Sequence, residues 1–280
     1  MKDMRWTIDI NKCNGCYVCQ IACKDEYVDQ EWAPTAKPQP VIGQFWMRVN
    51  ETTRGTIPKV KTSYVPVPCQ HCQDAPCMAA ATGGAIYRRP DGIVVIDPAK
   101  AVGQKQLVAA CPYGAIFWND SLNLPQKCTG CAHLVDSPPL TGQPRAMPRC
   151  VDACPMGALV WGEYSDIQGT WDAAEVMHAE YNTNPRVRYN LLPHRFITGA
   201  LYDPVQDTCL EGADVTLTDL TDNSKHYVKT DIYGDFWFEY LPENHVYSVK
   251  IEMAGYYGKT LGAVYPGKDL NLGDIALYKM

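Results

Sequence analysis

The sequence lacks any run approaching the roughly 18 apolar residues that a membrane-spanning helix needs. The most apolar stretch, residues 41–49, is interrupted by Gln44 and Arg48. The N-terminal residues MKDMRWTIDINKC offer neither the apolar segment nor the small-residue cleavage site of a signal peptide. Thiols also need reducing conditions during assembly. We therefore expect a cytoplasmic chain that does not insert into a membrane directly.

Basic charge is also in short supply. Lys and Arg number 25 against 31 Asp and Glu, which gives a net charge of −6. Proteins that bind nucleic acid usually present a basic face, so no nucleic-acid partner is expected. The six histidines lack a ligand spacing such as H-x3-H, and no nucleophile motif is present. We therefore expect this chain to hold no catalytic residues.

Cysteine, by contrast, is abundant: there are thirteen, and twelve fall in short runs or beside them. A disulfide framework is one alternative, but it suits small secreted domains, and neighbours two residues apart are poorly placed to bridge one another. Zinc is another alternative, but four cysteines with C-x2-C-x2-C-x3-C spacing are more specific to iron–sulfur clusters than a lone C-x2-C. The runs contain Cys13, Cys16, Cys19 and Cys23; Cys69, Cys72 and Cys77; Cys111; and Cys128, Cys131, Cys150 and Cys154.

The spacing also predicts how the runs combine. In C-x2-C-x2-C-x3-C, three thiolates bind one cluster and the fourth binds a neighbouring cluster. Applied to all the runs, this exchange favours a nested pairing with three sets of four ligands. Set 1 comprises Cys13, Cys16, Cys19 and Cys154; set 2 comprises Cys128, Cys131, Cys150 and Cys23; set 3 comprises Cys69, Cys72, Cys77 and Cys111.

Four positions at which the pairing would allow further ligands hold other residues. The position four residues after Cys77 is Ala81, and those expected before Cys111 are Ala101, Gln104 and Leu107. Together these would form the complete ligand set of a fourth cluster. The sequence therefore predicts three [4Fe-4S] clusters.

A second kind of pattern begins after Pro193. Short segments alternate between apolar and polar residues and are separated by turn signals, which predicts strands of a β-sandwich or barrel over residues 195–280. The glycine and aspartate pattern resembles transthyretin-like or carboxypeptidase-regulatory-like domains. Cys209 lies here, away from every run, and is interpreted as a buried structural thiol. The predicted strands are residues 196–202, 213–218, 226–230, 236–240, 247–251 and 275–278.

Between the two regions, residues 171–181 have the composition of a short helix, and Asn-Thr-Asn-Pro follows as its breaker. We interpret this segment as a linker that packs.

The four runs, ending in Cys111-Pro-Tyr-Gly-Ala and Cys154-Pro-Met-Gly-Ala, resemble the ferredoxin-type iron–sulfur subunits of the molybdopterin oxidoreductases of the dimethyl sulfoxide reductase family. The resemblance implies an α+β fold in which residues 1–194 form two ferredoxin-like lobes with pseudo-two-fold symmetry. Lobe a would hold about residues 1–60 and 121–194, and lobe b about residues 61–120. Members of the family usually carry four clusters, so the residues at positions 81, 101, 104 and 107 are a departure.

Three clusters followed by a C-terminal β-domain are similar to the small subunits of transhydroxylases within this family. The resemblance then implies a heterodimer with a large catalytic subunit that carries molybdenum on two molybdopterin guanine dinucleotides. Alternatives are the iron–sulfur subunit of a reductase for arsenate, polysulfide or dimethyl sulfoxide, a chain whose clusters are largely structural, and a free-standing polyferredoxin.

Overall fold

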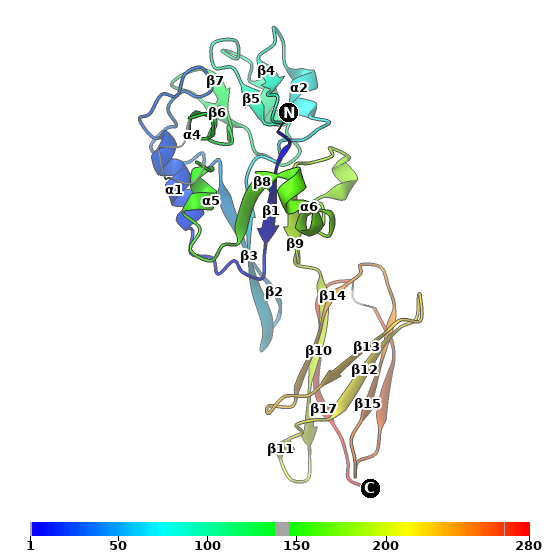
Figure 1. Ribbon diagram of the computed structural model, residues 1–280. Helices are drawn as coiled ribbons and strands as arrows, with labels where there is room; N and C mark the ends of the chain where they lie inside the picture. Colours follow the sequence, from blue (N-terminus) through cyan, green and yellow to red (C-terminus); the bar gives the residue numbers. More distant parts are fainter. Residues whose placement is uncertain (1, 138–145, 266) are drawn as a thin grey trace. The chain divides into compact units, whose positions relative to one another are not determined.

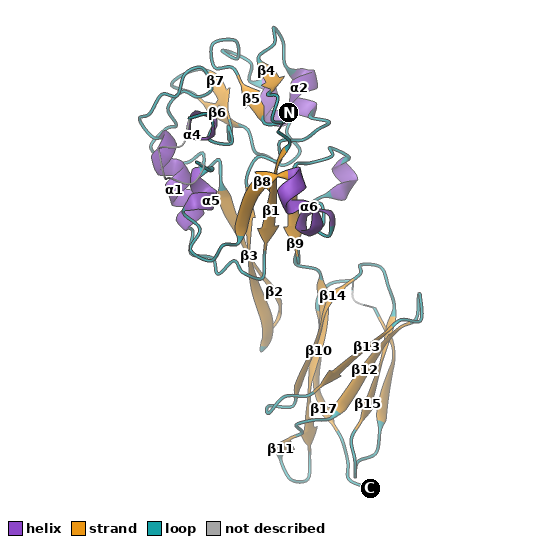
Figure 2. Cartoon of the chain, viewed as in Figure 1, coloured by secondary structure: helices purple, strands orange, loops and turns teal. Residues whose placement is uncertain are grey.

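The computed structural model describes residues 2–137, 146–265 and 267–280. The chain divides into two compact units (Figure 1). The first contains Met1–Glu51 and Tyr64–Leu192, and the second contains Thr52–Ser63 and Pro193–Met280. Figure 2 shows that strands occur in both units, whereas the helices of the described residues all belong to the first. None of these helices is both long and apolar enough to cross a membrane.

A three-stranded sheet lies in the core of the first unit. Strand β1 (Met4–Asp9) is central, pairing antiparallel with β8 (Leu159–Glu163) and parallel with β9 (Val187–Asn190). Met4, Trp6 and Ile8 alternate along β1 and are buried, as the two-residue period of a strand requires. The core around them includes cysteines of sets 1 and 2.

The rest of the first unit consists of short helices and two-stranded hairpins that carry the cysteine runs. The helices are α1 (Val18–Tyr27), α2 (Pro76–Ala80), α3 (Gln106–Ala109), α4 (Ala132–Val135), α5 (Arg149–Asp152), α6 (Tyr164–Asp172) and the 3-10 turn η1 (Ala179–Tyr181). The hairpins are β4 (Ile86–Arg88) with β5 (Val94–Ile96), and β6 (Phe117–Asn119) with β7 (Leu124–Gln126).

A longer hairpin, formed by β2 (Arg48–Thr56) and β3 (Lys59–Val67), belongs to both units. Its tip, residues 52–63, groups with the C-terminal residues. Arg54 Nη1 lies 3.1 Å from Asp269 Oδ1, and Lys61 pairs with Glu239. The second unit therefore includes a segment far from it in sequence.

The second unit is a β-sandwich. One sheet contains β10 (Arg195–Asp203), β11 (Thr208–Cys209), β14 (Asp235–Leu241) and β17 (Leu270–Ala276). The other contains β12 (Asp214–Asp219), β13 (Lys225–Lys229), β15 (Tyr247–Glu252) and β16 (Lys259–Val264). Buried side chains of both sheets, such as Ile197 and Val249, form one core. Five of the six predicted strands are confirmed; the sixth, residues 275–278, overlaps only the end of β17, which begins earlier and ends at Ala276. Strands β11 and β16 are additional.

The helix predicted over residues 171–181 is wrong. Helix α6 lies earlier and ends at Asp172, and only the 3-10 turn η1 falls at the end of the predicted range. Between them, Glu175 exchanges two backbone hydrogen bonds of 2.8 Å with Tyr189 of β9. This pairing uses backbone groups that a continuous helix would need, so a tertiary contact overrides local composition.

Candidate metal centres

The four cysteines of set 3 surround one cavity. Cys69 and Cys72 follow β3, Cys77 lies on α2, and Cys111 follows α3. The cavity encloses about 340 Å³ including its opening, and His71, Tyr113 and Lys127 also line it. Four sulfur atoms from three separate segments thus converge on one space.

Set 1 forms a second cavity of about 290 Å³ including its opening. Cys13 and Cys16 lie in the loop after β1, Cys19 is on α1, and Cys154 follows α5. Val49 and Leu159 complete the walls. Cys16 is exposed whereas Cys19 is buried, so this site lies close to the surface.

Set 2 lies in the interior. Cys23 on α1 and Cys150 on α5 are buried, and so is Cys131 immediately before α4. Burial raises the pKa of Cys23 and of Cys150 well above the ordinary range, and the charges of Cys128 and Cys131 raise both further. The four thiols of set 2 therefore lie near enough to one another for their charges to interact.

The donor chemistry of the three sets fits iron. Burial raises the pKa of Cys72 to about 12 and that of Cys77 to about 11, so free thiols would stay protonated. A metal that replaces these protons supplies the positive charge that buried thiolates require. None of the thirteen cysteines forms a disulfide in this structure. A single zinc ion needs only four sulfurs at about 2.3 Å, whereas the C-x2-C-x2-C-x3-C spacing of Cys13 to Cys23 is the one that holds iron–sulfur clusters.

Backbone amides point at the sulfur atoms. The N–H of Ala115 donates to Cys111 Sγ at 3.4 Å, and the N–H of Ala158 donates to Cys154 Sγ at 3.3 Å. In set 2, the N–H of Gly130 donates to Cys128 Sγ at 3.3 Å. Hydrogen bonds of this kind favour the thiolate and tune a bound cluster.

The third residue adopts a left-handed backbone in three C-x2-C pairs, Cys13–Cys16, Cys69–Cys72 and Cys128–Cys131. Its φ angle is 71° at Gly15, 44° at His71 and 65° at Gly130. Glycine adopts this conformation without steric cost, which explains two of the three residues. The same C-x2-C spacing therefore occurs with the same left-handed third residue at all three sites.

His71 is the exception, and its contacts are specific. The backbone N–H of Val94 donates to His71 Nδ1 at 3.2 Å, and the ring stacks on Trp6 with 5.1 Å between the ring centroids. His71 is therefore held by a backbone hydrogen bond. His71 Nε2 is buried and has no hydrogen-bond partner among the described residues.

Lys127 was not singled out by the sequence, although it directly precedes Cys128. Its side chain is buried, and Nζ donates to the carbonyl oxygens of Val94 and Cys128. Burial alone would lower the pKa of Lys127, but the thiolates of Cys69, Cys128 and Cys77 outweigh it, so the pKa is raised. The only indication of Lys127 in the sequence is that a lysine, Lys12, stands at the same place before Cys13.

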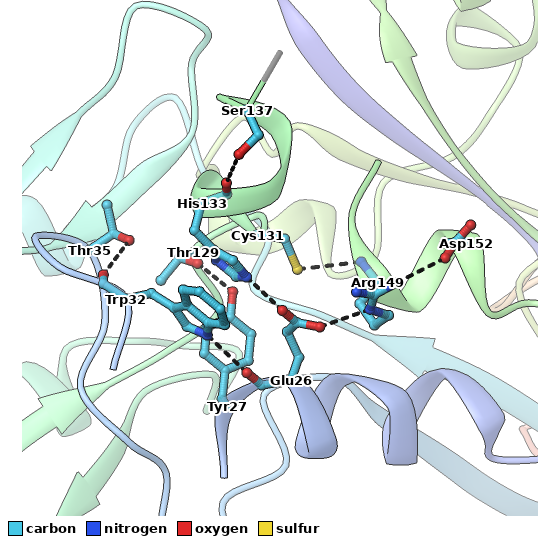
Figure 3. Close-up of polar contacts among 10 residues, drawn as sticks. All are labelled: Glu26, Tyr27, Trp32, Thr35, Thr129, Cys131, His133, Ser137, Arg149 and Asp152. Atoms are coloured by element: carbon cyan, nitrogen blue, oxygen red, sulfur yellow. Dashed lines mark hydrogen bonds and ion pairs between the residues drawn. The ribbon is translucent and has the colours of Figure 1, made fainter. Parts of the chain in front are cut away.

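A polar network that the sequence also did not indicate supports set 2 (Figure 3). Glu26 accepts hydrogen bonds from His133 Nε2 at 2.7 Å and from Arg149 Nε at 2.8 Å. Glu26 follows Cys23 by one turn of α1, His133 lies on α4, and Arg149 precedes Cys150 on α5. The backbone N–H of Arg149 also donates to Cys131 Sγ at 3.4 Å. One carboxylate thus connects the three helices that carry or flank set 2.

The four positions without cysteine also lie together. Ala101 and Leu107 are fully buried in one small apolar core, and Ala81 packs against it. The side chain of Gln104 hydrogen-bonds the backbone N–H and C=O of Thr82, at 3.0 and 3.1 Å. Ordinary apolar packing and one amide therefore fill this part of the fold.

The remaining candidates lie in the second unit. Cys209 is exposed on β11, which corrects the interpretation of a buried thiol, because the short strand lies at the edge of its sheet. His245 Nδ1 lies 2.6 Å from Asp219 Oδ2, and Asp222 is close enough to complete a three-residue group with ligand atoms within 4.8 Å of one another.

Two protein-family models match the chain. Residues 60–164 match the family model of the 4Fe-4S dicluster domain, and residues 197–278 match that of the carboxypeptidase regulatory-like domain. The cysteine sets and the first of these matches define an iron–sulfur protein, in which a carboxypeptidase regulatory-like β-domain follows the cluster-binding region.

Similarity over the full length of the chain shows which iron–sulfur proteins it is related to. The chain is 38% identical to the pyrogallol hydroxytransferase small subunit of Pelobacter acidigallici, covering 99% of this chain and 100% of that one. It is 36% identical to a sulfite dehydrogenase subunit of Allochromatium vinosum (70% and 85%) and 32% identical to a tetrathionate reductase subunit of Salmonella typhimurium (68% and 73%). The chain belongs to the iron–sulfur subunits of the dimethyl sulfoxide reductase family of molybdopterin enzymes, together with the small subunit of pyrogallol hydroxytransferase.

Proposed function

We propose that this chain holds three [4Fe-4S] clusters, one at each cysteine set, and exchanges electrons with a large molybdopterin-containing subunit in a heterodimer. The observation that carries the proposal is the convergence of twelve cysteines in three groups of four, two of them around defined cavities. A four-thiolate set is the usual ligand complement of one [4Fe-4S] cluster. The apolar core formed around Ala101 and Leu107 supports three clusters over four.

We propose further that the partner converts pyrogallol to phloroglucinol and that this chain contributes no catalytic residues. The similarity to the pyrogallol hydroxytransferase small subunit extends over 99% of the chain, whereas the similarities to the dehydrogenase and reductase subunits named above extend over 70% and 68%. The transhydroxylation has no net redox change, so three clusters suffice without a relay to a distant membrane partner. Molybdenum with two molybdopterin guanine dinucleotides would lie on the large subunit.

The proposed architecture is a pair of ferredoxin-like lobes with pseudo-two-fold symmetry, in a complex that assembles in the cytoplasm. The repeated turns after Cys111 and Cys154 support the symmetry: the glycine three residues on has φ of 58° at Gly114 and 57° at Gly157. The alanine that follows each glycine donates its N–H to the cysteine sulfur.

Co-purification with the partner, followed by iron analysis and an assay of pyrogallol conversion, tests the proposal. About twelve iron atoms per chain are expected, four for each cluster. Cys111→Ala should remove about four of them, and the matched control Cys209→Ala should remove none. Zinc in place of iron, or about eight or sixteen irons, would contradict three clusters.

The same complex separates the alternative functions. Reduction of the clusters by pyrogallol, seen by spectroscopy, supports electron exchange with the molybdenum site. Clusters whose oxidation state never changes during turnover would support a structural role instead. A partner that reduces arsenate, polysulfide or dimethyl sulfoxide would exclude the transhydroxylase.

A further inference from the structure

Lys127 occupies a position between two of the cysteine sets. It is followed directly by Cys128 of set 2, and its side chain lines the cavity of set 3. Only 2% of the residue is exposed. A single lysine therefore lies against two candidate clusters at once.

Two hydrogen bonds fix the ammonium group. Nζ donates to the carbonyl oxygen of Val94 at 2.5 Å and to that of Cys128 at 2.8 Å. Val94 belongs to β5, whose residues are buried and paired with β4. The charge thus has a defined place and is not a flexible surface charge.

Sulfur atoms balance this charge. Among residues 2–137, 146–265 and 267–280, no carboxylate forms an ion pair with Lys127. Lys127 lines the same cavity as Cys69 and Cys77 of set 3, and its ammonium donates to the backbone carbonyl of Cys128, a ligand of set 2. A buried ammonium without such partners is costly, since burial of an unpaired charge takes several kcal/mol.

We propose that Lys127 is a shared positive charge that raises the reduction potentials of the clusters at sets 2 and 3, an inference that rests on the proposed function. Four thiolates make a bound cluster anionic, and reduction by one electron adds one negative charge. A fixed ammonium beside the cluster stabilises the reduced form more than the oxidised form, because Coulomb attraction grows with that added charge. Lys127 would act through the clusters and not on a substrate.

Lys12 provides a matched control within the chain. It precedes Cys13 of set 1 as Lys127 precedes Cys128, but its side chain is 57% exposed and lies 3.9 Å from Asp9. Solvent and salt screen an exposed charge, so Lys12 should contribute little to the potential of set 1.

The test is potentiometric titration of the purified complex, with dithionite as the reductant and electron paramagnetic resonance as the readout. Lys127→Met keeps the length of the side chain and removes the charge. We expect it to lower the one-electron reduction equilibrium constants of two clusters at least tenfold each, a shift of at least about 59 mV to more negative potential. The third cluster should stay unchanged, and Lys127→Arg and Lys12→Met should titrate like the unsubstituted complex.

Iron content distinguishes the possible failures. If Lys127→Met retains about twelve irons and titrates like the unsubstituted complex, the charge has no role and the inference is overturned. If Lys127→Met loses iron while Lys127→Arg keeps it, the need for a positive charge at this position is supported. Iron loss in both variants overturns the inference, because it would show that the site requires the shape of the lysine side chain and not its charge. Absence of three clusters from the unsubstituted complex would instead refute the proposed function.

Discussion

Two loops of the first unit have nearly the same sequence and opposite surroundings. Lys12-Cys13-Asn-Gly-Cys16 and Lys127-Cys128-Thr-Gly-Cys131 both follow the pattern K-C-x-G-C, and both contain a glycine with left-handed backbone. Lys12 and Cys16 are exposed, whereas Lys127 and Cys131 are buried. The loop motif therefore determines how the sulfurs are presented, and contacts with distant residues determine the dielectric environment in which they act.

Removal of one thiol from each loop should give the largest difference. We expect Cys16→Ala to cost about four irons and to leave the first unit folded. Cys131→Ala should abolish cluster binding at set 2 and strongly lower the yield of folded protein. Binding of a structural metal is part of the folding free energy, and the remaining thiols are buried. Iron per chain and yield of the complex measure both. Equal losses in the two variants would remove the distinction between the loops.

The second largest effect is expected for Glu26, the carboxylate that supports only the buried loop. Glu26→Gln should lower the free energy of unfolding by about 2–3 kcal/mol, because His133 and Arg149 lose a charged partner whose side chain is 10% exposed. Guanidinium unfolding under anaerobic conditions, followed by cluster absorbance, measures the change. The control is Glu31→Gln, since the exposed pair of Glu31 with Lys37 should contribute only about 0–1 kcal/mol. An effect no greater than that of the control would argue against the network.

Substitution of Gly15 and Gly130 should destabilise the exposed loop more than the buried loop, the opposite of the order expected for the thiols. A left-handed backbone costs an alanine about 1–2 kcal/mol at either position. The added Cβ would lie 2.5 Å from the ring of Tyr64 at Gly15, but 3.1 Å from Ile93 at Gly130. We therefore expect Gly15→Ala to destabilise more, by about 2 kcal/mol against about 1 kcal/mol. The same unfolding measurement checks this, and a larger effect at Gly130 would show that interior packing dominates here too.

The smallest expected effect is a pH dependence specific to the buried loop. Burial raises the pKa of Glu26, but the hydrogen bonds and charges of His133 and Arg149 outweigh it and lower the pKa below the ordinary value. A lowered pKa in the folded state stabilises the fold above the unfolded pKa of about 4.3, and this contribution is lost as pH falls through the folded pKa.

The measurement is the difference in unfolding free energy between the unsubstituted protein and Glu26→Gln, from neutral pH down to about pH 3. This difference should shrink below about pH 4.5. A difference that is constant with pH would mean that the ionised carboxylate is not what stabilises the helices.

Much of the architecture could be predicted from local pattern. Alternation from Phe196 onward correctly predicted five strands of the sandwich because the strand period is short and one face of each strand is buried. The helix predicted over 171–181 was wrong because Glu175 pairs with Tyr189, a contact that no local pattern indicates. Strands β11 and β16 were not predicted; β11 comprises only two residues.

The sequence by itself determined the chemistry: twelve cysteines at spacings that suit iron–sulfur clusters, four positions that lack them, and a lysine before two of the cysteine pairs. Only the tertiary structure decided that Lys127 is buried beside two cysteine sets while Lys12 faces solvent, and that Glu26 joins His133 to Arg149. The physical reason is the separation along the chain over which each property is determined. Spacing along the chain fixes which atoms a short loop can present, whereas burial and charge pairing depend on residues that folding brings from more than a hundred positions away.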